Sequence, residues 1–231
     1  EDAIVRTVHY GTHVEGNDLS LLEAEKLVRQ DPQRDESASD VAKRAGIEAR
    51  DRDVQEVINY RNVLKAIDQA VEQNKINLKA NREYRFKYTQ DQFLQFHTLS
   101  TERVINPAEV GVFRQTQVVV RGLNKGEIVH RPPNAVEIPY QIEDFFFWLN
   151  SNLTRDLHPV IKAAIAHYEL ARIHPFMEGN GRSSRAEALL ILAIEGIDAR
   201  RFFSIEEHFD KNIEEYYLAF DNVTKAGGDL T

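Results

Sequence analysis

Hydrophobic residues recur at helical spacing along most of the chain. The longest such run is made of six aliphatic residues: Val54, Val57, Ile58, Leu64, Ile67 and Val71. Steps of three, four and seven residues place these side chains on one face of a helix, so the run predicts a long amphipathic helix. Shorter runs with the same spacing precede and follow it, and together they predict a mainly α-helical protein.

Capping signals mark where some of these helices begin. Ser20 and Glu23 form a capping box, in which each side chain accepts a hydrogen bond from a free backbone N–H group of the first turn. A helix should follow to about Arg29. Thr89 and Gln92 form a second box, and the helix behind it carries four apolar residues: Phe93, Leu94, Phe96 and Leu99.

Further helices are predicted over residues 4–11, 140–149 and 213–223, where apolar side chains again recur at helical spacing. The first of these should end at Gly11. Residues 33–40 carry no apolar side chain larger than that of alanine, so they are predicted to form a loop.

Two segments in the C-terminal half are apolar enough to be buried. Residues 159–173 are apolar on nearly every face, and Pro159 suits the first position of a helix. Such a pattern predicts a central helix that is buried on all sides. Residues 182–195 form another helix, which Gly196 should close as its C-terminal cap.

The middle of the chain has the pattern of a β-hairpin. Residues 116–121 predict a first strand, residues 122–126 a turn, and residues 127–130 a returning strand. The first strand contains a β-branched run: Val118, Val119 and Val120. The predicted fold is therefore a helical bundle around a buried central helix, with one small hairpin.

Composition narrows the possible functions. The chain has 231 residues, of which 42% are hydrophobic and 29% are charged, as in an ordinary globular protein. It has no cysteine, which excludes disulfides, thiolate zinc sites and cysteine nucleophiles. No stretch approaches the ~20 apolar residues that span a bilayer, so we expect no membrane partner and a cytoplasmic location.

The formal net charge is −8. Non-specific nucleic-acid binders usually have the opposite sign or a basic stripe, so nucleic-acid binding by these residues is disfavoured. A nucleotide is still a suitable ligand, because a local cluster of arginines and backbone N–H groups can hold a phosphate in an acidic protein.

One segment combines several groups that bind anions. Gly179, Asn180 and Gly181 run straight into a helix, where glycines allow close approach to a ligand and the free N–H groups and helix dipole favour negative charge. Arg182 and Arg185 follow in the first turn, the end of a helix at which cations are disfavoured. They therefore need an anion, such as a polyphosphate or a carboxylate.

Two further residues of this segment suit phosphoryl chemistry. Glu178 offers a hard oxygen beside the glycine turn, as Mg²⁺ prefers. His174 stands a few residues away and could take a proton from an attacking hydroxyl. Taken singly, each feature is more often structural. Together, eight fixed positions would match by chance about 10⁻¹⁰ times per window.

The eight positions form the pattern His-x-Phe-x-(Asp/Glu)-Gly-Asn-Gly-Arg-x-x-Arg, which residues 174–185 match completely. The sequence therefore resembles the Fic family. Three neighbouring segments also look like a Fic core: Val112-Phe113-Arg114, His130-Arg131-Pro132-Pro133 and His158-Pro159. The resemblance extends over about residues 1–231, although its evidence outside the signature is weaker.

The resemblance implies a protein adenylyltransferase, an enzyme that moves AMP from ATP to a Ser, Thr or Tyr hydroxyl of a target protein. His174 would be the catalytic base, and Asn180 and Arg182 would also serve catalysis. Glu178 would bind Mg²⁺, for which Mn²⁺ could substitute. Phe176 should be a core anchor.

The remaining roles implied by the resemblance concern phosphates and target. Gly179, Gly181 and the intervening asparagine would bind the α- and β-phosphates, Arg182 would stabilise their charge, and Arg185 would hold the γ-phosphate. The hairpin would be a flap that aligns the target segment by strand-like pairing, through three residues: Val118, Val119 and Val120.

A second match lies near the N-terminus. Residues 14–17, Val-Glu-Gly-Asn, resemble the inhibitory motif (Ser/Thr)-x-x-x-Glu-(Gly/Asn) of Fic proteins, although Gly11 stands where the pattern has Ser or Thr and Thr12 comes one place later. Alone, the segment could equally be a helix end with a glycine stop. In the Fic interpretation, Glu15 would pair with Arg185 and occupy the γ-phosphate position. The same carboxylate could orient a water for removal of AMP.

The resemblance also suggests a division of the chain into an N-terminal inhibitory helix region over residues 1–30, a helical extension over residues 31–88 and a Fic core over residues 89–231. Many Fic proteins continue into a winged-helix region, through which a longer parent could bind DNA. Expected partners are ATP and a target protein. Self-modification and a homodimer are further possibilities.

Alternatives to AMP transfer stay open. Another Fic enzyme could move UMP, phosphocholine or phosphate, although Gly181 argues against the phosphate-transferring branch, in which lysine replaces this glycine. A third interpretation is a regulatory module that senses ATP without chemistry. The intact His174 favours an enzyme.

Overall fold

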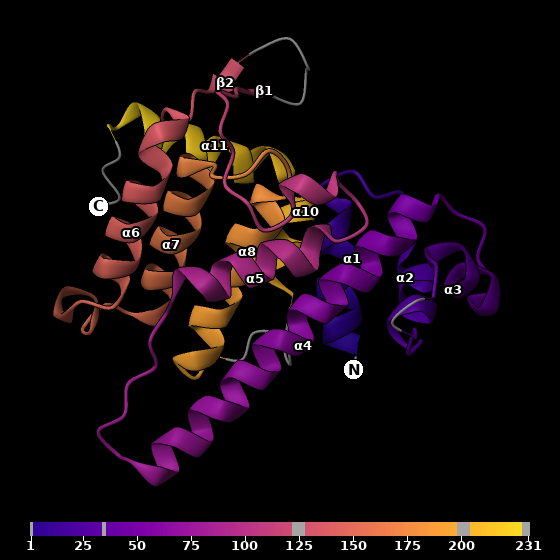
Figure 1. Cartoon of the computed structure of the whole chain (residues 1–231), viewed down its shortest axis with the longest axis horizontal. Coiled ribbons are helices and arrows are strands. Elements are labelled where there is room, and N and C mark those ends of the chain that lie inside the picture. The colour runs from indigo at the N-terminus through magenta and orange to yellow at the C-terminus, as the bar shows by residue number, and fades with distance from the viewer. Residues whose placement is uncertain (1, 34–35, 122–127, 198–203, 228–231) are drawn as a thin grey trace.

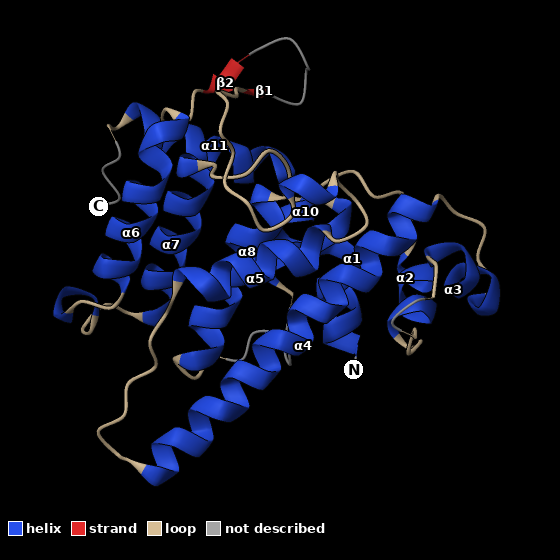
Figure 2. Ribbon diagram, in the orientation of Figure 1, coloured by secondary structure: helices blue, strands red, loops and turns tan. Residues whose placement is uncertain are grey.

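The computed structural model describes residues 2–33, 36–121, 128–197 and 204–227. Helices dominate it, and a single two-stranded sheet lies at one end (Figure 2). The helices are α1 (Asp2–His13), α2 (Leu21–Val28), α3 (Ala38–Ala45), α4 (Asp51–Ala80), α5 (Gln90–Thr101), α6 (Ile138–Leu149), α7 (Pro159–Ile173), α8 (Asn180–Ile194), α10 (Ile205–Lys211) and α11 (Ile213–Lys225). Short 3₁₀ helices occupy residues 107–109, 135–137 and 152–154.

The long amphipathic helix is confirmed as α4, with 30 residues. Its first half is buried, because α1, α2, α3, α5 and α8 pack against it. Its C-terminal end extends away from the other helices before the chain returns to α5 (Figure 1). The buried half supplies much of one continuous hydrophobic core that also includes α5, α6, α7 and α8.

The central helix is α8 rather than α7. Of the 15 residues of α8, 11 are buried, since α4, α5 and α7 all pack around it. The prediction that residues 159–173 are buried on all sides is wrong for the first turn of α7, where Val160 is 48% exposed and Ile161 50%. In the described chain the main contacts of α7 are with α8 and α6, which leave this end uncovered.

The predicted hairpin is confirmed, with shorter strands than expected. β1 (Val120–Arg121) pairs antiparallel with β2 (Ile128–His130), and Val120 lies opposite His130. Val118 and Val119 precede the strand. The predicted turn at residues 122–126 lies outside the described residues. No further strand flanks the pair in the described chain, and Val129 is 49% exposed, so little packing extends the strands.

The other differences between the predicted and the observed helices lie at capped helix starts. The box of Ser20 and Glu23 is complete, whereas at Thr89 only the threonine caps the helix. The predicted loop at residues 33–40 is wrong at its end, because Ser37 caps α3, and two of the three buried apolar residues of this helix, Val41 and Ala42, lie beyond residue 40. Ser204 likewise caps α10, which sequence periodicity missed.

Two helix ends are informative. α1 continues two residues past Gly11, whose face packs so closely on the Tyr60 ring that a Cβ would overlap it. α8 ends as predicted, with Gly196 at a φ of 88° directly after the cap. None of the helices in the described part of the chain is long and apolar enough to cross a membrane.

Candidate active site

The signature segment forms the turn between α7 and α8. His174 ends α7 in a left-handed conformation, with a φ of 49°, and Gly179 begins α8 with a φ of 82°. A Cβ at residue 179 would lie 2.6 Å from the Thr101 side chain, so only glycine fits between the turn and α5. The chain therefore reverses direction within a few residues, and the N-terminus of α8 follows His174 closely in the chain.

Buried contacts hold this turn from below. Phe176 is fully buried, as predicted for a core anchor, and its ring stacks on His97 with centroids 3.6 Å apart. The Asn180 side chain accepts a hydrogen bond from the Phe176 N–H and donates one to the Phe176 carbonyl, both at 2.9 Å. Both ends of the Asn180 amide are thus engaged with the backbone of the turn.

His97 is a second support of the turn. Its Nδ1 accepts from the Gly111 N–H at 2.9 Å, so its Nε2 carries the proton and donates to the Glu178 carbonyl at 3.0 Å. Burial lowers the pKa of His97 to about 4, which keeps the ring neutral in this arrangement. The sequence indicates a structural role for His97, but its partners could not be predicted, because they are 14 and 81 positions away.

The predicted inhibitory residue occupies the predicted anion site. The Glu15 carboxylate lies over Gly181 so closely that a Cβ there would overlap it, and its Oε1 is 2.9 Å from the Arg185 guanidinium. The Arg185 side chain is 2% exposed and that of Glu15 is 30% exposed. Arg185, beside the N-terminus of α8, therefore already pairs with a carboxylate of the same chain.

Electrostatics at this contact favour the ionised pair. Burial opposes the charge on Glu15, but Arg185 and Arg182 outweigh it and hold the pKa of Glu15 below its ordinary value. Burial likewise opposes the charge on Arg185, while Glu15 raises the pKa of Arg185 well above its ordinary value. Each charge is thus stabilised by the other.

Gly11 contributes through its backbone. The Arg185 guanidinium donates to the Gly11 carbonyl at 2.9 Å, whereas the Thr12 hydroxyl donates to the carbonyls of Val8 and His9 within its own helix. The missing Ser or Thr at position 11 is therefore replaced by a carbonyl, and Thr12 does not reach the arginine.

A tight turn after α1 presents Glu15. The N–H groups of Glu15 and Gly16 donate to the Thr12 and His13 carbonyls at 3.0 and 2.8 Å, and Gly16 has a φ of 91°. Asn17 ties the turn to α4 by donating to the Glu56 carboxylate at 3.0 Å. The segment thus ends α1 with a glycine and also places the Glu15 carboxylate beside Arg185.

Arg182 and Glu178 each contact a residue of α4. Arg182 lies 3.3 Å from Glu56 and 3.8 Å from Glu178, and Arg52 bonds to both of these carboxylates. Arg182 is 2% exposed, yet its Nε and one Nη find no aligned hydrogen-bond acceptor. An under-satisfied buried guanidinium beside a helix N-terminus is suited to phosphate oxygens.

One carboxylate at this place suits Mg²⁺ bound together with a nucleotide. Among the described residues no three His, Asp or Glu side chains gather as a metal cage. Mg²⁺ ordinarily uses one or two protein carboxylates and completes its shell with phosphate and water. The half-exposed side chain of Glu178 beside Arg182 fits that role.

His174 is held between the hairpin and the anion site. Burial, followed by the nearby His130 and Arg114, lowers the pKa of His174 to about 4, against a smaller opposing effect of the Ala171 backbone. Arg114 donates to the His174 carbonyl at 2.8 Å and to the Pro133 carbonyl at 2.7 Å. It thereby joins the His174 backbone to the base of the hairpin.

The hairpin itself stands at the edge of the molecule, beyond the ends of α6 and α7 (Figure 1). His130 on β2 bonds to the Arg172 carbonyl at 2.7 Å, and Gln117 donates to the Pro132 carbonyl at 2.9 Å. Of the three predicted flap residues, Val120 lies in the strand, and Val118 and Val119 lie in the segment leading to it.

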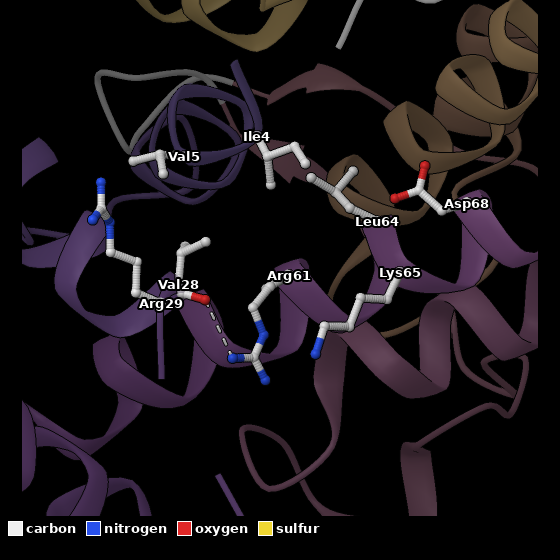
Figure 3. A pocket seen from close by; sticks show the side chains of 8 residues that line it. All are labelled: Ile4, Val5, Val28, Arg29, Arg61, Leu64, Lys65 and Asp68. Carbon is white, nitrogen blue, oxygen red and sulfur yellow. Dashed lines mark hydrogen bonds between the residues drawn. The ribbon is translucent and has the colours of Figure 1, made fainter. Parts of the chain in front are cut away.

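A cavity of about 320 Å³ lies elsewhere, between α1, α2 and α4 (Figure 3). It contains none of the predicted site residues. Its cations already have partners: Arg29 pairs with Glu25, Lys65 lies 3.8 Å from Asp31, and Arg61 donates to backbone carbonyls of residues 28 and 30. The residues that suit catalysis therefore gather at the α7–α8 turn.

Comparison with known proteins gives the same picture. Residues 87–192 match the model of the Fic/DOC family. Over 81 residues the chain is 47% identical to the protein adenylyltransferase Fic of Drosophila grimshawi and 46% identical to that of Drosophila melanogaster. Each match covers 35% of this chain and 15% of the relative, so the alignment spans a small part of the relatives' length.

Solved structures show the fold over nearly the whole chain. A Fic family protein from Desulfovibrio desulfuricans has a TM-score of 0.75 at 23% identity, covering 100% of this chain and 59% of that chain. A Fic domain protein from Bacteroides thetaiotaomicron has a TM-score of 0.69 at 21% identity, covering 99% and 74%. The fold is thus that of the Fic proteins. The chain belongs to the Fic family, as its signature predicted.

Proposed function

We propose that the protein is a Mg²⁺- and ATP-dependent protein adenylyltransferase that Glu15 holds in an inactive state. The observation that carries the proposal is the Glu15 carboxylate at the N-terminus of α8, over Gly181 and 2.9 Å from Arg185. A carboxylate there shows that the site stabilises an oxyanion. The name of the Drosophila relatives supports AMP transfer.

The proposed reaction joins a target hydroxyl to the α-phosphorus of ATP. As the oxygen attacks, the bond from the α-phosphorus to the bridging oxygen breaks, and pyrophosphate leaves. The hydroxyl proton passes to a His174 ring nitrogen. The pKa of His174 is lowered to about 4, so at neutral pH the ring is neutral and able to accept this proton.

Charge stabilisation comes from residues that are already ordered. The first N–H groups of α8 and the Arg182 guanidinium face the space in which the phosphates would lie, and Arg185 would hold the γ-phosphate once Glu15 leaves. Preorganised donors of this kind are commonly worth ~10²–10³ in rate each. Glu178 would hold Mg²⁺, which supplies neutralisation of phosphate charge when bound.

The hairpin supports the choice of a protein as the second substrate. β1 and β2 are short, and Ile128 and Val129 are 37% and 49% exposed, so an extended target segment could pair beside them. Arg114 connects this part of the chain to the His174 backbone, which would place the target close to the base.

Incubation with ATP labelled at the α-phosphate tests the proposal. We expect Glu15→Gly to raise labelling of the protein itself or of added proteins by about tenfold or more, since each 1.4 kcal/mol of relieved competition is worth a factor of ten. Glu48→Gly is the matched control, because it removes the same charge from an exposed loop.

The outcomes separate the rival interpretations. Labelling that persists in the Glu15→Gly, His174→Ala double variant would not be Fic chemistry. Labelling with UTP or CDP-choline in place of ATP would identify a different transferred group. ATP binding without any labelling by the Glu15→Gly variant would identify a regulatory module.

A further inference from the structure

Four alternating charges form a closed ring beside the signature turn. Arg52 and Glu56, one turn apart on α4, pair at 3.2 Å. Glu56 lies 3.3 Å from Arg182, which lies 3.8 Å from Glu178. Arg52 closes the ring with a hydrogen bond from its Nη2 to Oε1 of Glu178. We call these four residues the charge ring.

The members of the charge ring differ in freedom. Arg182 and Glu56 are 2% and 6% exposed, whereas Arg52 is 53% exposed and Glu178 is 43% exposed. Withdrawing Arg52 into water therefore costs little, while Arg182 has no such route. If Glu178 stays in place as a metal ligand, Arg52 is the member of the ring that can move away from it.

We propose that Arg52 is an inhibitory residue that occupies the metal-binding carboxylate, Glu178, separately from the block that Glu15 places on Arg185. The inference rests on the proposed function, because it takes Glu178 to be the ligand for Mg²⁺. Oε1 of Glu178 faces both Arg52 and Arg182. With a divalent cation on the same carboxylate, Arg52 would meet like charge and must turn away.

The charge ring also connects the two inhibitory contacts. Glu56 accepts from Arg52 and from Asn17, the residue that follows the Glu15 turn. α4 thus holds the metal-binding carboxylate through one residue and the inhibitory turn through another. The γ-phosphate position and the metal position are both closed from the N-terminal part of the chain.

A different role for Arg52, as a phosphate ligand, predicts the opposite sign. Loss of a phosphate-binding cation weakens ATP binding with and without Mg²⁺. Loss of a competitor for Glu178 strengthens ATP binding only when Mg²⁺ is present. The ratio of the two affinities therefore identifies the role.

The test is calorimetric binding of ATP by the full chain in the Glu15→Gly, His174→Ala background, which opens the γ-phosphate position and prevents turnover. Each protein is titrated once in Mg²⁺ and once in EDTA. We expect Arg52→Gln to tighten binding in Mg²⁺ by about two- to fivefold, the range for a partly exposed ion pair, and to leave binding in EDTA unchanged.

Arg29→Gln is the matched control. Arg29 is 57% exposed and pairs with Glu25 four residues away, as Arg52 does with Glu56, but it caps the C-terminal end of α2, outside the charge ring. This variant should change neither affinity. Arg52→Lys, which keeps the charge but loses the guanidinium fork, should fall between wild type and Arg52→Gln.

Three results would overturn the inference. Equal affinities for the background and its Arg52→Gln variant in Mg²⁺ would show that Arg52 does not compete for Glu178. Weaker binding in both titrations would make Arg52 a phosphate ligand. If the background itself bound no ATP in Mg²⁺, the proposed function would fall together with this inference.

Discussion

Arg182 and Arg185 lie one turn apart on α8 and are equally buried, but they meet their anions differently. Arg185 is 2.9 Å from the Glu15 carboxylate and donates to the Gly11 carbonyl, and both partners belong to the N-terminal segment. Arg182 faces two carboxylates at 3.3 and 3.8 Å and keeps two N–H-bearing nitrogens without an aligned acceptor.

The difference separates a removable partner from a built-in one. The turn that carries Glu15 is held by backbone bonds of its own and by Asn17, none of which involves α8. The Glu15 carboxylate could therefore leave Arg185 without moving α8. Glu56 belongs to α4, the central support of the N-terminal half, and cannot leave Arg182. In the proposed function, one side of the site would therefore open when Glu15 leaves, and the other would be ready for phosphate.

Both arginines can serve catalysis only if the reaction takes place at His174. In the Glu15→Gly background, His174→Ala should lower labelling by ~10²–10⁴-fold, the usual worth of a positioned base. Gel autoradiography measures the loss. His208→Ala, which removes an exposed histidine from α10, should leave labelling unchanged. Undiminished labelling without His174 would refute its role as base.

Replacing the two arginines tests whether both contact phosphate. In the same background, Arg182→Ala and Arg185→Ala should each lower labelling by ~10²-fold, because each removes a preorganised positive charge. Steady-state kinetics with varied ATP would record both effects. If Arg182→Ala alone kept full activity, the preset half of the site would have a purely structural role.

A double-mutant cycle measures the removable pair directly. In urea unfolding, Glu15→Gln and Arg185→Ala should be coupled by about 0.5–3 kcal/mol, as expected for contacting residues. The exposed pair of Arg29 and Glu25 should be coupled by about 0.3–0.5 kcal/mol. Equal coupling in the two cycles would show that burial adds nothing to the contact.

The pH dependence should give the smallest effect. Arg185 holds the pKa of Glu15 below its ordinary value of 4.5, so the stabilisation from this carboxylate is complete above pH 4.5 and is lost as pH falls through the lowered pKa. The difference in unfolding free energy between wild type and Glu15→Gln should therefore stay constant from pH 7 to 5 and shrink below 4.5. A difference that grew on acidification would contradict the ion pair.

Local patterns predicted the signature turn well. Residues 174–185 carry their chemistry within one contiguous stretch, so glycine geometry, dipole and charge could all be inferred from neighbours in sequence. The long helix α4 and the buried α8 were likewise visible from hydrophobic spacing. Glu15 was found because it stands in a second short motif.

Long-range pairing could not be predicted in the same way. Arg52 and Glu178 are 126 positions apart, and a half-exposed arginine on an amphipathic helix has the sequence pattern of any solvated residue. α3 and α10, with 8 and 7 residues, were missed because short helices depend on a single cap and on tertiary packing. The bonds of the Asn180 amide to the Phe176 backbone could not be predicted from the motif, and its part in phosphate binding stays a prediction.

The face of Gly181 that lacks a Cβ is filled by an oxygen of the same polypeptide. An inhibitor tied to its own site cannot be diluted, so the inhibited fraction would be independent of protein concentration. It would be set by a unimolecular equilibrium of the Glu15 turn, against which ATP competes at its own concentration. α1 is held partly by the hydrogen bond from Arg6 to Glu207 on α10. In the proposed function, a change that weakens this contact would release Glu15 and activate the enzyme from a distance.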